Sequence, residues 1–491
     1  MSADKLNIFN FSDKKTVTLH LSWVAFFITF FMWFSHSSLM PLIQATFGLS
    51  TAETKALLFL NVALTIPSRT LVGMLVDKFG PRLMFSVLLV VSGLFCIGFS
   101  MAQSYEQLAA FRFLLGFAGA GFVIGIRLIT EWFPAKQAGT AQGIYGGWGN
   151  FGAAAAGFIL PALAAFFGGE DGWRSAAGSA GFVSIIYAVF FYIKVRNTPK
   201  GSTYFSPKKL GPMEVTSKGD FYLYIIMCAP MFLAMGVITW RLSPAGVGLL
   251  SESVAQMIWV GLAVWYCYQI VQIRSVNRDN LRTEIPELHR YKFKQVAILN
   301  LAYMVTFGSE VAVVSMLPLY FIDTFAVSIA VAAAMASTFM AMNLIARPGG
   351  GYISDKVGRK RSLLITVAGS CIGYAGMTFI TSDWSIALTM AVVVFCSFFV
   401  QAGAGATFGV VPTIKRRLTG QIAGMTGAYG NVGAASFLLI YSLFDALTFF
   451  TVIAVCCAVV FVLISFFLDE PKGQIAEILP DGTVELIDVG K

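Results

Sequence analysis

Long apolar segments separated by short polar loops recur along the whole chain and predict its organisation. Each segment can cross a bilayer as a helix, which takes about 20 apolar residues. None alternates apolar and polar residues as the strands of a membrane barrel do. We expect fourteen membrane-spanning helices, at residues 20–44, 53–76, 83–102, 107–133, 138–167, 173–195, 221–240, 254–273, 295–321, 331–353, 362–380, 385–411, 419–444 and 449–468.

These segments fall into groups of six, two and six, which predicts two halves joined by an insert. Residues 1–195 form the N-terminal six-helix half, and residues 295–468 form the C-terminal six-helix half. Residues 196–294 are cytoplasmic linkers around an inserted transmembrane hairpin at 221–273, and residues 469–491 are a tail. The predicted fold class is an all-α polytopic membrane protein, with two six-helix halves and an inserted two-helix hairpin.

Lysine and arginine lie mainly in alternate loops, and the positive-inside rule places these loops in the cytoplasm. We therefore expect a multi-pass protein of the cell (inner or plasma) membrane with both termini cytoplasmic. Two inserted spans preserve this orientation, whereas one span would reverse it. In the tail, apolar and polar residues alternate around Pro480-Asp481-Gly482, which predicts a small cytoplasmic β-hairpin.

Composition narrows the class of protein. Of 491 residues, 57% are hydrophobic and only 12% are charged, and the mean hydropathy of +0.76 excludes a string of soluble domains. The net charge of +9 is explained by topology, so we expect a lipid bilayer and no nucleic acid as partner. The seven cysteines and three histidines show no ligand spacing, so we expect neither a metal site nor a cofactor.

A charged turn occurs twice, once after the second span of each half. The first copy consists of Gly73, Asp77, Lys78, Gly80 and Arg82. The second copy consists of Gly351, Asp355, Lys356 and Gly358 at the same spacing. A single charged loop would only set topology, but self-similarity at this separation indicates a tandem duplication of six helices.

One arginine lies inside the apolar second span of each half. Arg69 and Arg347 each stand four residues before a copy of the charged turn, with no acidic residue within one helical turn. A charge at membrane depth is costly unless it is paired or faces a water-filled cavity; the alternative is a snorkelling side chain. Symmetry places both on the inner surfaces of the halves, where two guanidinium groups suit a planar oxyanion.

A strip of small residues with one asparagine occurs in the fifth span of each half, at 146–157 and 427–435. Small residues let a helix backbone approach closely, and a buried amide needs a partner. One copy would more often be a packing seam, but two copies indicate a duplicated, pore-lining element for a small anion. The central residues of the two strips are Gly149 and Asn150, and Gly430 and Asn431.

Two parallel halves with the repeated charged turn resemble the major facilitator superfamily. By this resemblance the turn is a gating motif between helices. The arginine in the second and eighth core helices, with the Gly/Asn strip in the fifth and eleventh, resembles its nitrate/nitrite porter family. By this resemblance the arginines clamp nitrate or nitrite, Asn150 and Asn431 orient it, and Phe122, Tyr303 and Phe307 sandwich it. Taken singly, these aromatic residues are more often packing residues. The inserted hairpin departs from the family's twelve core helices.

Moving an anion into a negative-inside cell costs roughly 2.3 kcal/mol per charge per 100 mV, so uptake needs proton symport or exchange for another anion. Two facing guanidinium groups repel in an empty cavity, which favours exchange of nitrate for nitrite. Glu310, three residues beyond Phe307, is the candidate for proton coupling, although pairing with a neighbouring helix explains it equally well. Glu131 can pair with Arg127 on its own helix. Both modes stay open, with proton symport preferred.

Other functions fit the chain less well. A carrier for another small organic anion, such as formate or oxalate, also needs cationic residues but does not require the doubled Gly/Asn strip. A membrane enzyme is not expected, because ligand pairs are missing. A transporter-like sensor is a further possibility. It would be indicated if Arg69→Ala failed to reduce flux while anion-dependent signalling remained.

Overall fold

The computed structural model describes residues 6–169, 171–207, 210–282, 290–471, 473–478 and 484–490. The helices of the first half are α1 (Lys14–Phe47), α2 (Thr51–Ala63), α3 (Thr65–Phe79), α4 (Pro81–Ser100), α5 (Tyr105–Leu114), α6 (Gly121–Trp132), α7 (Ala135–Phe167) and α8 (Gly172–Lys194). The helices that follow are α9 (Lys218–Leu242), α10 (Glu252–Asn277), α11 (Phe293–Tyr303), α12 (Ser309–Phe325), α13 (Ile329–Ala341), α14 (Asn343–Val357), α15 (Arg359–Met377), α16 (Ile386–Val410), α17 (Thr419–Leu443) and α18 (Ala446–Phe467).

The predicted all-α polytopic architecture, with two six-helix halves and an inserted hairpin, is confirmed. Ten helical stretches in the described part of the chain are long and apolar enough to cross a membrane. The other predicted spans correspond to α15, α17 and two interrupted pairs, α2 with α3 and α13 with α14.

The interruptions were not predicted, and they lie at the same place in both halves. The break after α2 lies at Leu64, five residues before Arg69, and the break after α13 lies at Met342, five residues before Arg347. Pro67 weakens the first helix here because its ring nitrogen cannot donate a helical hydrogen bond. The seventh core span is also irregular, with a π-helical turn at Met304–Gly308. Such turns inside helices are frequent at functional sites.

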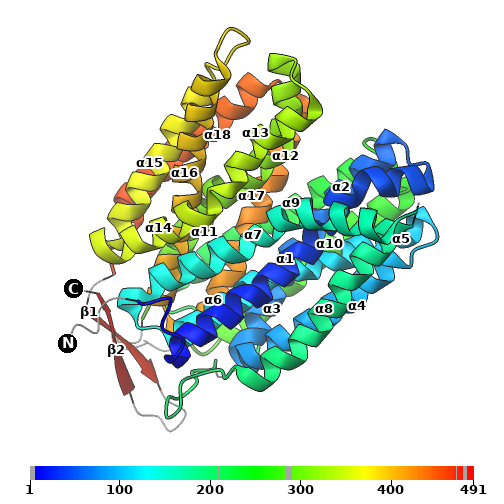
Figure 1. Cartoon of the computed structure of the whole chain (residues 1–491). Helices are drawn as coiled ribbons and strands as arrows, with labels where there is room; N and C mark the ends of the chain where they lie inside the picture. Colours follow the sequence, from blue (N-terminus) through cyan, green and yellow to red (C-terminus); the bar gives the residue numbers. More distant parts are fainter. Residues whose placement is uncertain are drawn as a thin grey trace.

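The halves meet along two long seams. α7 of the first half packs against α14 and α16, and α17 of the second half packs against α3 and α6. The helices converge at the end that carries the termini and diverge toward the other end (Figure 1). We call the converging end, which contains both copies of the charged turn, the motif end.

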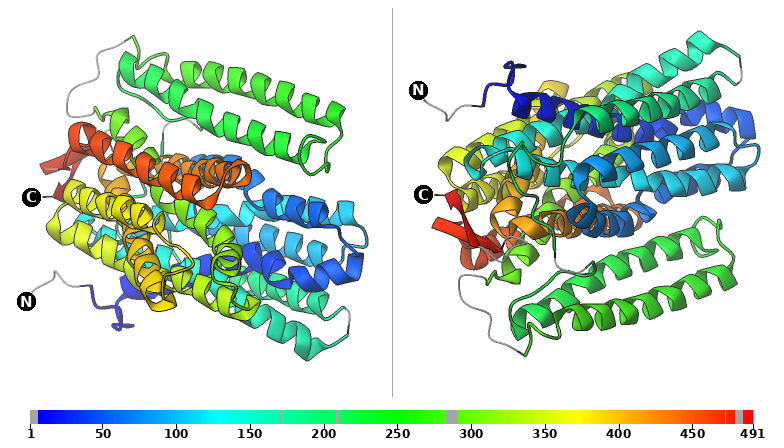
Figure 2. Two further views of the ribbon diagram at one scale, coloured as in Figure 1. Left: turned by 90° about the horizontal axis from the view of Figure 1, so that it is seen from above. Right: turned by 90° about the horizontal axis from the view of Figure 1, so that it is seen from below.

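The inserted hairpin forms an outer layer on one flank (Figure 2). α9 packs against α17 and α11 of the second half and against α2 and α3 of the first, whereas α10 packs mainly on α9. The Tyr429 hydroxyl of α17 donates to the Met227 carbonyl of α9 at 2.6 Å. Thr70 of α3 donates to the Met231 sulfur at 3.7 Å. One turn of α9 therefore bridges the α3–α17 seam.

The tail forms the predicted β-hairpin. β1 (Gly473–Ile478) pairs antiparallel with β2 (Val484–Gly490). The predicted turn at Pro480-Asp481-Gly482 lies outside the described residues. Glu470, just before β1, accepts from the backbone amides of Arg359 and Lys360 at 2.6 and 2.7 Å, so the tail is anchored at the start of α15.

Candidate anion site

Arg69 is fully buried and reaches across to the opposite half. Its Nε donates to the carbonyl of Gly119 at 3.0 Å, within its own half. Its Nη1 donates to the carbonyl of Gly427 on α17 at 2.7 Å. Its Nη2 has no hydrogen-bond partner among the described residues. The guanidinium is thus positioned by two backbone oxygens and keeps one donor nitrogen available.

Arg347 is buried in the equivalent place in the second half. Its Nη2 donates to the Tyr303 hydroxyl at 2.7 Å, and its Nη1 is unpartnered within the described chain. In the same part of the chain, neither Arg347 nor Arg69 forms an ion pair with an acidic side chain. A buried cation without a counter-ion is costly. The uncompensated positive charge of Arg69 and Arg347 therefore favours binding of an anion.

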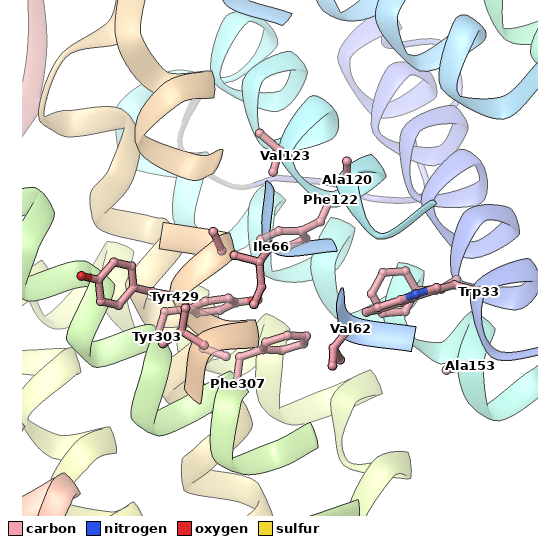
Figure 3. Packing of buried hydrophobic residues seen from close by; sticks show 14 of the residues in the cluster. Trp33, Val62, Ile66, Ala120, Phe122, Val123, Ala153, Tyr303, Phe307 and Tyr429 are labelled. Carbon is pink, nitrogen blue, oxygen red and sulfur yellow. The ribbon is translucent and has the colours of Figure 1, made fainter. Parts of the chain in front are cut away.

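Both guanidinium groups lie over the same two aromatic rings. The Cζ atoms of Arg69 and Arg347 are 5.7 and 5.4 Å from the Phe122 centroid, and 5.2 and 5.5 Å from the Phe307 centroid. Figure 3 shows Phe122, Tyr303 and Phe307 near one another in the buried core. The structure therefore brings together five of the predicted site residues, from both halves.

The three predicted aromatic rings are nearly parallel. Phe122 and Tyr303 are 6.0 Å apart with planes 7° apart, and Tyr303 and Phe307 are 4.9 Å apart with planes 2° apart. Carbon atoms in contact are 3.5–4.0 Å apart, so a flat anion between two rings needs roughly 7 Å. Occupation between Phe122 and Tyr303 therefore requires a small separation of the rings.

Phe408 of α16 completes the aromatic cluster and was not predicted. Its ring stands at right angles to Phe122 and Tyr303, at centroid distances of 4.5 and 4.8 Å. Edge-to-face contact of this kind fixes the orientation of both rings. No charged or amide side chain stands beside Phe408 in the sequence, so it resembles the other aromatic residues of an apolar helix.

The two Gly/Asn strips receive the arginines of the opposite halves. A Cβ added at Gly146 would lie 3.2 Å from Nε of Arg347, and one at Gly427 would lie 3.2 Å from Cδ of Arg69. Glycine at these positions therefore leaves room for the guanidinium stems. Each arginine consequently packs on the strip of the half to which it does not belong.

The asparagines of the strips are buried beside these contacts. Asn431 donates from Nδ2 to the Gly427 carbonyl at 3.3 Å, the same oxygen that accepts from Arg69. Within the described residues the Oδ1 atoms of Asn431 and Asn150 have no partner. Each amide can present its N–H or its oxygen to a ligand by turning about its last bond.

The glycines before the asparagines have different neighbours. A Cβ at Gly430 would meet the Phe307 and Tyr303 rings at 2.6 and 2.8 Å. A Cβ at Gly149 would meet the Phe26 ring of α1 at 1.9 Å. The absence of a side chain at Gly430 thus leaves room for the Phe307 and Tyr303 rings. Gly149 instead packs against Phe26.

Glu310 is buried next to Arg347, on the α12 side of the site. Its Oε1 accepts from Nδ2 of Asn343 at 2.6 Å, and its Oε2 has no partner in the described part of the structure. Asn343 begins α14, one turn before Arg347. Asn343 was not predicted, although an amide at membrane depth one turn from a candidate arginine was a usable signal. The predicted pairing of Arg127 with Glu131 is confirmed, at 2.8 Å.

Comparison with known proteins identifies the family to which this architecture belongs. The family model described as Major Facilitator Superfamily matches residues 22–273 and 299–486. A nitrate/nitrite transporter from Nostoc punctiforme is 43% identical over 476 residues, covering 96% of this chain and 95% of that protein. The chain belongs to the major facilitator superfamily, in its nitrate/nitrite porter family. A nitrate/nitrite transporter from a Picosynechococcus strain is 42% identical, with 94% of each chain covered.

A solved structure supports the fold of this porter. The proton:xylose symporter XylE superimposes with a TM-score of 0.62 over 94% of this chain and 97% of that one, at 14% identity. At this identity the likeness concerns the fold alone.

The first charged turn of the porter binds the start of α17. The Asp77 carboxylate accepts from the backbone amides of Gly420 and Gln421 at 2.8 Å each, and forms an ion pair with Arg127 at 3.0 Å. A carboxylate at a helix N-terminus satisfies free amides and complements the helix dipole. A Cβ at Gly73 would lie 2.4 Å from the Gly420 carbonyl, so α3 and α17 touch through their backbones.

The second charged turn makes the same contact with α7. Asp355 accepts from the amides of Gly139 and Thr140 at 3.0 and 2.6 Å and pairs with Arg359 at 2.7 Å. A Cβ at Gly351 would lie 2.0 Å from the Gly139 carbonyl. Two aspartates thus lock the two halves of the porter together at the motif end.

The remaining motif residues shape the turns. Gly80 and Gly358 have φ angles of 86° and 113°, which favour glycine. Nε of Arg82 donates to the Tyr192 carbonyl at 2.7 Å within the first half. Lys78 and Lys356 are exposed.

Proposed function

We propose that this porter carries nitrate and nitrite across the cell membrane by alternating access. The observation that carries the proposal is the pair of buried guanidinium groups from opposite halves, set over the same two rings with one donor nitrogen unpartnered on each. A planar anion with three oxygens can accept from both arginines while its face stacks on the rings. The names of the similar transporters support this substrate class.

The proposed cycle uses the two ends of the molecule differently. We place the motif end in the cytoplasm, in agreement with its basic loops. Asp77 and Asp355 then hold the cytoplasmic side closed, while the halves diverge toward the outside (Figure 1). An anion entering from outside neutralises one of the two positive charges, which lowers the repulsion that opposes closure around it.

We propose proton symport as the mode of coupling, with Glu310 as the proton-carrying group. Uptake against the membrane potential costs roughly 2.3 kcal/mol per charge per 100 mV, and a proton moving with the anion cancels this cost. Glu310 is buried beside Arg347 and has one unpartnered oxygen among the described atoms, which supports this role. Exchange of nitrate for nitrite is the competing mode.

Nitrate uptake into proteoliposomes tests the proposal, with an inward proton gradient or internal nitrite supplied separately. For symport we expect uptake driven by the proton gradient alone, and its loss in Glu310→Gln. Arg69→Ala and Arg347→Ala should each reduce uptake about 30-fold or more, because truncating one buried charged contact costs about 2 kcal/mol or more. Uptake that needs internal nitrite would contradict symport. Transport of formate or oxalate without nitrate would contradict the substrate class.

A further inference from the structure

Glu310 and Asn343 together contain two unsatisfied atoms that match each other. The structure joins Oε1 of Glu310 to Nδ2 of Asn343 at 2.6 Å. It leaves Oε2 of Glu310 and Oδ1 of Asn343 buried, both without a partner in the described part of the chain. A buried acceptor that is left unpaired has lost its hydrogen bonds to water without gaining one in the protein, which is unfavourable. A carboxyl group and a primary amide remove this cost when one proton on the acid donates to the amide oxygen.

We propose that Asn343 is the positioning residue that holds Glu310 in its protonated form and separates it from Arg347. This inference rests on the proposed proton symport. A proton arriving with the anion binds Oε2 of Glu310, whose O–H then donates to Oδ1 of Asn343, while Oε1 continues to accept from Nδ2. When the proton leaves toward the cytoplasm, Oε2 becomes an anionic acceptor for Arg347 and competes with the bound nitrate.

The surroundings of Glu310 fit a group that alternates between these partners. The titratable and charged groups near its carboxyl are Arg347 on α14, Tyr303 on α11 and Tyr374 on α15. The Tyr303 hydroxyl accepts from Arg347, and the Tyr374 hydroxyl donates to Ser309 at 2.7 Å. The described parts of α13, α16 and α17, which also pack on α12, contain no charged residue. Arg347 is therefore the cation to which an ionised Glu310 can turn.

The arrangement of Glu310, Asn343 and Arg347 in the structure is the one expected when Glu310 is protonated. Among the described ion pairs none joins Glu310 to Arg347, although the two groups are electrostatic neighbours. An ionised carboxylate with a buried, unpartnered oxygen beside a cation would move to pair with it. A protonated carboxyl bound to Asn343 has no such drive.

Asn343 also touches the interface between the halves. A Cβ added at Gly147 of α7 would lie 2.4 Å from the Asn343 carbonyl oxygen. α14 and α7 form one of the two seams. A change of partner at Asn343 therefore occurs on a residue whose backbone is in contact with the opposite half.

Only one half contains such a pair. At the 278-residue offset between Arg69 and Arg347, the first half has Met32 and Thr65 in place of Glu310 and Asn343. Thr65 donates to the Gly116 carbonyl at 2.9 Å, within its own half. The empty site with ionised Glu310 then has a net charge of +1, as does the nitrate-loaded site with protonated Glu310. This equality indicates one proton per anion.

The pH profile of nitrate uptake in Asn343→Leu tests the inference. Leucine keeps the branch at Cγ, although its methyl groups make it larger than asparagine, and it offers no hydrogen bond, so Glu310 is released to pair with Arg347. We expect half-maximal proton-driven uptake to shift toward acid pH by about one unit or more, with nitrate/nitrite counterflow retained at acid pH, where Glu310 is protonated and does not compete with nitrate for Arg347. Thr65→Val, which removes the corresponding bond of the first half, should keep the wild-type profile.

Infrared difference spectroscopy on the purified protein keeps the test decisive if Asn343→Leu fails to transport. We expect the wild type to show a protonated-carboxyl band that disappears in Glu310→Gln and shifts in Asn343→Leu. A wild-type pH profile and an unshifted band in Asn343→Leu, with proton-driven uptake in the wild type, would overturn the role of Asn343 and leave symport intact. Absence of proton-driven uptake in the wild type would instead overturn symport.

Discussion

At the residue scale, the site is a cationic pair whose position is set by neutral groups. Arg69 is held by two backbone carbonyls, and Arg347 by the Tyr303 hydroxyl. Neutral acceptors fix the direction of a guanidinium without cancelling its charge, as a carboxylate would. The bound anion therefore meets the full positive charge of both residues.

Tyr303→Phe should weaken nitrate binding by removing the acceptor that orients Arg347. A hydrogen bond to a charged group contributes about 1.5–3 kcal/mol, so we expect the nitrate KM to rise about 10-fold or more. Initial uptake rates over a range of nitrate concentrations measure this. Tyr374→Phe is the matched control, because its hydroxyl bonds Ser309 and touches neither arginine. Equal KM values in the two variants would contradict the role of Tyr303.

The unchanged net charge of the loaded and empty sites predicts electroneutral transport. At a fixed proton gradient, nitrate uptake should not change when the membrane potential is varied with potassium and valinomycin. An uptake rate that increases with a negative interior would mean that more than one proton accompanies each nitrate.

At the scale of helices, function depends on backbones that touch. The glycines of the charged turns and of the Gly/Asn strips allow α3 to meet α17 and α14 to meet α7 without intervening side chains. Close contact of this kind leaves two surfaces that fit in one arrangement and must separate as units. Regular helices with larger residues would hold the halves too far apart for the arginines to cross.

Gly351→Ala should prevent the motif end from closing. Its methyl group would lie 2.0 Å from a backbone oxygen of Gly139, which cannot move aside as a flexible side chain could. We expect nitrate uptake to fall more than about 10-fold while the protein remains folded. Gly157→Ala is the control on α7, the helix that Gly351 of α14 meets, because nothing lies within 4 Å of its added methyl group. Nitrate uptake measures the transport defect, and circular dichroism shows whether each variant is folded. Equal uptake in the two variants would contradict the prediction.

At the scale of the whole molecule, two equivalent locks hold one end shut. Asp77 accepts from amides in the first turn of α17, and Asp355 accepts from amides in the second turn of α7, so each aspartate binds a helix of the opposite half. Release of both contacts is needed before the halves can separate at the motif end. The hairpin adds a further contact on one flank, because α9 touches α3 and α17 together.

Asp77→Asn should favour opening of the motif end. The amide keeps the shape of the side chain but loses the charge that pairs with Arg127 and complements the start of α17. We expect faster hydrogen exchange at the start of α17 and slower nitrate uptake. Asp445→Asn is the matched control, since Asp445 caps α18 through Thr448 at 2.9 Å and lies away from both seams. Equal exchange rates in wild type and Asp77→Asn would contradict a locking role.

Sequence patterns predicted the fold because each apolar span must satisfy its backbone hydrogen bonds within the membrane and therefore forms a helix. The duplication then singled out Arg69 and Arg347, because an arginine stands at the same position in both halves. The pattern could not predict which way each helix face turns once the halves meet. Gly149 and Gly430 occupy matching places in the sequence, yet one faces Phe26 and the other faces Tyr303 and Phe307. The break at Leu64 was missed although Pro67 lies three residues after it, and no proline lies within five residues of Met342 to mark the second break.

The crossing of each arginine onto the opposite strip bears on the ancestry of the chain. Before duplication and fusion, two copies of a six-helix protein would have met about a twofold axis, and each would have supplied the other's missing wall. One copy alone would have lacked the opposite strip on which its arginine packs, so this site would have required a dimer. Fusion then allowed the copies to diverge, and the acid–amide pair of one half is a specialisation that a symmetric ancestor could not have confined to one side.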